Sequence, residues 1–251
     1  MLAVFKREFK AYFSNPLGFI ILAVLYFFLG LGFYQIFGAG VPYMEYVVLF
    51  PAQLGVLFFV IPVTTMRMFS DERRTKTDQL LFTAPVKLIN IVLGKFLAAY
   101  VLYIMGFIPT VFFQIILSCF VSTSLFYYIY ALIGVLIFGA ALIAVGMFIS
   151  TLTESPIISI IFTLIVNLFI MFSSGFASMI TIPSKTNTFF EAIGAFILKT
   201  VSKFLNGMNF LGVLESFSNQ SLAIKDIVYF VSITIAFIFL TERSLEKRRW
   251  S

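Results

Sequence analysis

The sequence contains no histidine and a single cysteine, Cys119. Without histidine the chain lacks the most common general base of enzymes and the most common protein ligand of metals. One cysteine excludes an internal disulfide and any zinc site built from cysteines. We interpret Cys119 as a small apolar filler in a membrane helix.

Charge is also scarce, at 11% of residues, whereas 61% are hydrophobic and 34 are phenylalanine. A soluble domain of 251 residues has too little polar surface to cover that much apolar material, but a lipid bilayer removes the need for cover. The net charge of +6 comes from basic residues in short blocks between apolar runs. Such blocks are typical of topology anchors beside anionic lipids and not of nucleic-acid binding. The composition predicts an all-α integral membrane protein.

The uncharged runs predict six transmembrane helices, since one crossing needs about 20 mostly apolar residues. They lie near residues 17–37, 46–66, 89–117, 125–151, 156–180 and 223–241, within one transmembrane domain, 1–251. The run from Phe96 to Thr153 is too long for one crossing, and we divide it at the polar patch Ser118–Ser124. The first run has a long basic leader and no small-residue cleavage site, so we expect a retained span and not a signal peptide.

Residues 181–222 form a loop in which apolar residues recur at helical spacing beside scattered charges. We expect amphipathic or re-entrant helices at the outer membrane edge; the alternative is a seventh span. Six spans place both ends of the chain on one side. Basic residues gather at both ends and in the loop 67–88, so the positive-inside rule favours six spans with both termini in the cytoplasm. Residues 242–251 then form a basic cytoplasmic tail.

Residues 1–16 predict a helix that lies in the cytoplasmic interface and turns into the first span at Asn15-Pro16. Leu2, Phe5, Phe9, Tyr12 and Phe13 share one face, and Lys6, Arg7, Glu8 and Lys10 occupy the rest. This helix is either a membrane anchor or a contact surface for a cytoplasmic partner.

The loop 67–88 is the most polar stretch of the chain. Ser70 is placed to cap a helix whose first turn holds Asp71 and Glu72. An apolar patch, Leu80, Leu81 and Phe82, lies near the end of this segment, and Pro85 stops it. The loop is either a docking helix for another protein or an ordinary solvated loop.

The predicted spans contain small and apolar residues and few groups that could take part in catalysis or ion coupling. Span 125–151 carries small residues, including the pairs Ala140/Ala144 and Gly146/Ser150, which favour an intramolecular packing seam over a dimer face. The predicted spans hold almost no ionisable residue at mid-depth, which argues against a secondary transporter and against an intramembrane hydrolase. We interpret Glu154, between two spans, as a helix-end residue and not a catalytic one.

Two stretches resemble the ABC-2 type permeases, most closely their gliding-motility-associated subgroup. The first covers residues 61–96, with matches at Pro62, Met66, Phe69, Glu72, Arg73, Thr77, Leu80, Leu81, Pro85, Val86, Gly94 and Lys95. The second covers residues 5–18, with matches at Phe5, Lys6, Glu8, Tyr12, Phe13, Pro16 and Gly18. No Walker A motif is present, so this chain does not bind ATP in that way.

The resemblance implies a bacterial plasma-membrane subunit that binds no cofactor and pairs with a second copy or a paralogue. A cytoplasmic ATP-binding cassette ATPase would hold ATP-Mg and seat the coupling helix between spans two and three. ATPase-coupling residues would be Asp71, Glu72, Arg73, Arg74, Thr77, Leu80, Leu81 and Pro85, with Asp71–Thr83 moving as one rigid lever. The interfacial residues Phe5, Lys6, Arg7, Glu8 and Phe9 would touch the same ATPase, and the outer loop would form a lid that an accessory subunit could join.

The resemblance therefore implies a permease that exports an amphiphilic or apolar substrate and is not itself an enzyme. The alternative is an ABC-like membrane module that transmits force or signal to a partner without moving cargo.

Overall fold

The computed structural model describes residues 1–37, 51–77, 87–120, 125–179 and 224–249, with short pieces at 198–200, 202–203, 207 and 210. The predicted site residues Leu80, Leu81 and Pro85 lie outside the described residues, as do most of the outer loop 181–222 and the first residues of the second predicted span. The described part is mostly helical and contains no strand.

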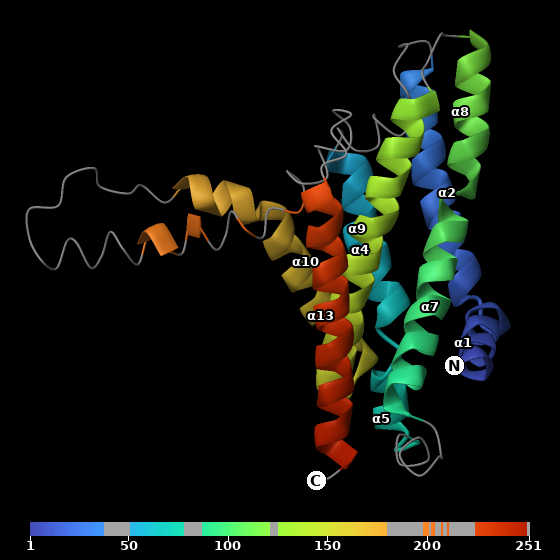
Figure 1. The fold of residues 1–251 in the computed structure, drawn as a ribbon. Helices are drawn as coiled ribbons and strands as arrows, with labels where there is room; N and C mark the ends of the chain where they lie inside the picture. Colours follow the sequence, from blue (N-terminus) through green and yellow to red (C-terminus); the bar gives the residue numbers. More distant parts are fainter. Residues whose placement is uncertain are drawn as a thin grey trace, which may run out of the picture.

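A bundle of long apolar helices forms the body of the protein (Figure 1). Their bounds are α2 Leu17–Ile36, α4 Pro51–Thr65, α7 Leu88–Gly106, α8 Ile108–Phe120, α9 Leu125–Leu152, α10 Pro156–Met179 and α13 Ile224–Arg249. Within the described residues, five helical segments are long and apolar enough to cross a membrane, counting α7 with α8 as one. The described part of α4 has 15 residues, about 22 Å of helix, which is short of the bilayer core.

Helix α9 is the centre of the bundle and packs against α4, α7, α10 and α13. Its small residues make this possible, because a side chain at Gly146 would collide with Thr65 of α4 at 2.4 Å and approach Thr163 of α10. Ala144 and Ser150 are also fully buried inside the protomer. At these positions the small-residue seam packs within the chain.

Two prolines each leave a helix carbonyl without its usual partner, and a side chain from another helix satisfies it. The predicted third span is not one helix: it breaks at Phe107, because Pro109 cannot donate to the Met105 carbonyl, which accepts the Tyr26 hydroxyl at 3.0 Å. Pro62 inside α4 frees the carbonyl of Phe58, which accepts the side-chain amide of Asn167 from α10 at 3.5 Å.

The chain begins with α1, Leu2–Ser14, which lies beside the same end of the bundle as the C-terminal end of α13 (Figure 1). Asn15 is extended, as the residue before Pro16 should be, and α2 follows at once. The apolar face of α1 carries a row of aromatic rings, with centroids 5.7 Å apart for Phe5 and Phe9 and 5.2 Å for Phe9 and Phe13.

Helix α13 does not end where the apolar sequence ends. It continues through the basic residues of the predicted tail to Arg249, so at least residues 242–249 are helical. At the other end of the bundle, Phe210 is buried against Phe138 of α9 and Phe230 of α13, and Tyr229 donates to the Gly207 carbonyl at 2.5 Å. This part of the outer loop therefore reaches into the bundle.

Candidate functional site

The predicted coupling segment begins with a short helix, α5, Ser70–Arg74. The continuous helix expected up to Thr83 is wrong, because the helix ends at Arg74 and Lys76 has a left-handed backbone, with φ of 56°. The expected cap is also wrong. Ser70 is the first helical residue, and its hydroxyl donates to the carbonyl of Met66.

A side chain from another helix caps α5 instead. The Ser150 hydroxyl, near the end of α9, accepts the backbone N–H groups of Phe69 at 3.1 Å and Ser70 at 3.2 Å. Ser150 and Ser70 are fully buried. The first turn of a helix has N–H groups without partners in its own helix, and here the neighbouring span satisfies two of them. The position of α5 is therefore fixed on α9.

Arg73 ties the same two helices together. Its guanidinium donates to the Leu152 carbonyl at 3.0 Å and pairs with Glu154 at 2.7 Å. Arg248 of α13 donates to the neighbouring Thr151 carbonyl. Two cations thus lie at the C-terminal end of α9, where free carbonyls and the helix dipole favour positive charge. The expected helix-end role of Glu154 agrees with this placement.

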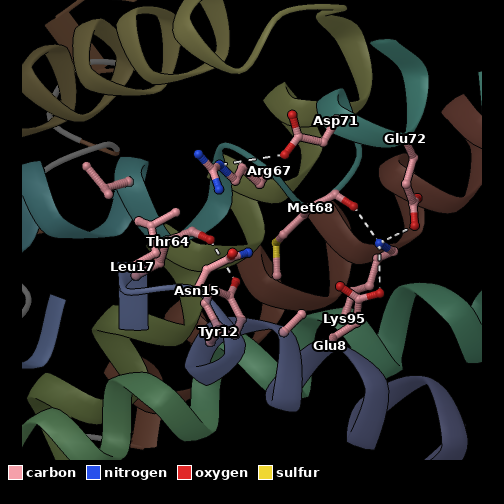
Figure 2. Close-up of a pocket in the computed structure, with 12 residues that line it drawn as sticks. Glu8, Tyr12, Asn15, Leu17, Thr64, Arg67, Met68, Asp71, Glu72 and Lys95 are labelled. Atoms are coloured by element: carbon pink, nitrogen blue, oxygen red, sulfur yellow. Dashed lines mark hydrogen bonds and ion pairs between the residues drawn. The ribbon is translucent and has the colours of Figure 1, made fainter. Parts of the chain in front are cut away.

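Glu72 points in the opposite direction, toward α7 and α1. The Lys95 ammonium of α7 lies 2.8 Å from Glu72, 3.3 Å from Glu8 of α1 and 2.6 Å from the Met68 carbonyl (Figure 2). Lys95 is 2% exposed. Arg7 joins the same group, at 2.7 Å from Glu8 and 3.3 Å from Glu72. We call Arg7, Glu8, Glu72 and Lys95 the charge junction.

Lys95 stands in the matched motif but not among the predicted site residues. The signal was present, since Lys95 is the one charged residue in the apolar stretch 88–120. The neighbouring Gly94 allows α1 and α7 to approach each other closely beside Lys95. A side chain on Gly94 would lie 3.0 Å from Val4 and 3.2 Å from the Met1 carbonyl, so α1 crosses α7 in close contact.

A cavity of about 220 Å³ opens beside the charge junction, between α1, α4, α5 and α7. Figure 2 shows Tyr12 closing one side through a hydrogen bond to the Thr64 carbonyl, 2.7 Å long, and Arg67 pairing with Asp71 at 3.6 Å. Burial raises the pKa of Glu72 above its ordinary value, against the attraction of Lys95. Burial also raises the pKa of the Tyr12 hydroxyl.

The remaining predicted residues lie on α1 and on the outward side of α5. Phe5 and Phe9 are half-buried in the aromatic row of α1, and Lys6 is exposed. On α5, Asp71 is half-buried and holds both Arg67 and Arg74 at 3.6 Å. The outward surface of the segment, which we call the α5 face, consists of Arg67, Asp71, Arg74, Lys76 and Thr77.

Comparison with protein families places this arrangement in a known context. The family model described as ABC-2 family transporter protein matches residues 43–241, which is 199 of the 251 residues. The comparison with curated proteins returned no match. The match includes most of the bundle and all of α5. The chain therefore belongs to the ABC-2 transporter family and is a membrane component of an ABC transporter.

Proposed function

We propose that this chain is the permease subunit of an ABC exporter for an amphiphilic or apolar substrate, driven by ATP that a separate cytoplasmic ATPase hydrolyses. The observation that carries the proposal is the division of α5 into two sides. Glu72, Arg73 and the Ser150 cap tie its inner side to α1, α7 and α9. The α5 face remains open, with Arg74 at 66% exposure.

The charge distribution supports a cytoplasmic position for this end. Lys6, Arg7 and Lys10 of α1, the cations of the α5 face and the basic end of α13 all lie there, whereas Lys225 lies at the opposite end. By the positive-inside rule, the end rich in lysine and arginine faces the cytoplasm. Both termini would then be cytoplasmic, in a bacterial plasma membrane, and the α5 face would meet the ATPase.

The choice of substrate class rests on a second cavity, at membrane depth between α2, α4 and α10. It has a volume of about 550 Å³, within the range of ligand pockets. Every lining residue is nonpolar: Val24, Phe28, Gly55, Val56, Phe58, Phe59, Val60, Leu168, Met171 and Phe172. An ion or a sugar would find no polar partner in this cavity. An acyl chain needs none and would be buried against apolar side chains. Pairing with a second copy or a paralogue would complete the path.

Transport of a fluorescent phospholipid analogue in proteoliposomes with the partner ATPase tests the proposal. A Cβ atom at Gly55 would meet nothing within 4 Å, so Gly55→Leu adds apolar volume at the cavity from an open backbone position. Gly175, outside the cavity lining, is equally open and provides the control Gly175→Leu.

We expect ATP-dependent movement of the analogue with the wild type and Gly175→Leu, and its loss with Gly55→Leu. Coupled ATP hydrolysis without movement of any lipid probe would instead favour a module that transmits force or signal.

A further inference from the structure

We propose that Lys95 is a positioning residue that joins α5 to α1, so that the two helices move as one body when α5 is displaced. The inference rests on the proposed function only in naming the ATPase as the source of that displacement. The joint itself is a property of the chain.

The geometry makes Lys95 the common partner of three elements. Its ammonium, from α7, contacts Glu72 of α5, Glu8 of α1 and the Met68 carbonyl of the segment between α4 and α5. One oxygen of Glu72 accepts hydrogen bonds from both Lys95 and Arg7. One oxygen of Glu8 accepts a hydrogen bond from Arg7 and forms an ion pair with Lys95. Each carboxylate is therefore shared by two cations.

Helix α1 contacts α7 and α5 through different kinds of interaction. Its packing on α7 includes a close apolar contact, Val4 against Gly94, which needs no charge. Among the described residues, the side-chain bonds that link α1 with α5 are ionic: Arg7 to Glu72 directly, and Glu8 to Glu72 through Lys95. Loss of Lys95 removes the buried partner of both carboxylates and leaves them Arg7, whose side chain is 58% exposed. An exposed ion pair contributes little, so the two carboxylates repel each other and are hydrated separately.

The other side of α5 does not depend on this junction. Ser150 and Arg73 hold α5 on α9 through contacts that Lys95 does not share. A variant without the ammonium should therefore loosen α1 from α5 and leave α5 on α9. This selective loss distinguishes a positioning role from a general contribution to folding.

The test uses pairs of spin labels on the full chain in lipid nanodiscs, in a Cys119→Ser background that removes the native cysteine. One pair, at Lys10 and Thr77, reports the distance from α1 to α5. A second pair, at Thr77 and Leu152, reports the distance from α5 to α9. Lys10, Thr77 and Leu152 are exposed. The variants are Lys95→Met, the conservative Lys95→Arg, and the control Lys87→Met, which removes an exposed ammonium from the start of the same helix.

We expect a narrow distribution of α1–α5 distances in the wild type, in Lys87→Met and in Lys95→Arg. When the ATPase is bound, ATP should not shift this distribution. Lys95→Met should broaden the α1–α5 distribution even without ATP and leave the α5–α9 distribution unchanged.

The proposal is overturned if Lys95→Met keeps the narrow α1–α5 distance, if both distances broaden together, or if Lys95→Arg or Lys87→Met broadens like Lys95→Met. The measurements without ATP need no ATPase. If no ATPase binds the chain, the proposed function fails while these distances still decide the role of Lys95.

Discussion

Replacement of Ser150 by alanine tests whether α9 caps α5. The variant removes the one side-chain oxygen that accepts the N–H groups of Phe69 and Ser70, at a fully buried position. A buried donor left without a partner costs about 1–3 kcal/mol, and loss of an N-cap costs about 1 kcal/mol. These costs describe overlapping contacts, so we expect a loss of about 2 kcal/mol in the free energy of unfolding.

For a chain of this length, about 2 kcal/mol corresponds to a fall of about 4–8 °C in Tm. Thermal unfolding in detergent, followed by circular dichroism, measures the change. Hydrogen exchange should at the same time become faster at the amides of Phe69 and Ser70. Ser118→Ala is the matched control, because Ser118 is exposed and bonds to the carbonyl of Ile115 in its own helix. If Ser150→Ala melts with the wild type and its exchange is unchanged, the cap is not a stabilising contact.

Three further changes test other contacts. Gly94→Val should displace α1, because the new side chain collides with Val4, and raise the protease sensitivity of residues 1–16; unchanged cleavage would contradict the close crossing. Asn167→Leu should lower the free energy of unfolding by about 1–3 kcal/mol, and Tm with it, since the Phe58 carbonyl freed by the proline loses its partner. An unchanged Tm would show that another group satisfies this carbonyl. Glu72→Gln should raise Tm relative to the wild type more at pH 7.5 than at pH 5. The raised pKa of Glu72 means that its ionisation opposes folding, so its stabilising contribution is present at low pH and is lost as the pH rises through the folded-state pKa. The opposite trend would mean that Lys95 outweighs burial.

Charge gaps located the five long apolar segments found among the described residues, because charge inside a bilayer is costly. Leu17 begins α2 and Pro156 begins α10, both at the expected positions. The division of the third span at Phe107 was missed, although Pro109 was visible in the sequence. A proline can kink a membrane helix without ending the crossing, so hydropathy alone does not show the break.

The internal bonds of the candidate site were not predictable in the same way. Ser70 had the right residue type for a cap, but the hydroxyl that performs this task, Ser150, is 80 residues away in the sequence. Sequence reasoning likewise treated Glu8 and Glu72 as partner-facing charges, whereas the structure turns both toward Lys95. A motif shows which residues recur; which way each side chain points depends on the packing of helices distant in sequence.

Capture of the partner ATPase by the purified full-length chain tests the central claim most directly. The test variant is Arg74→Glu with Lys76→Glu, which reverses the charge of the α5 face and leaves the charge junction intact. The control is Lys225→Glu, a charge reversal at an exposed position on the opposite end of the bundle. We predict that the wild type and the control retain the partner ATPase and that the α5 variant loses it. Equal retention by all three proteins, or capture by none, would contradict the account.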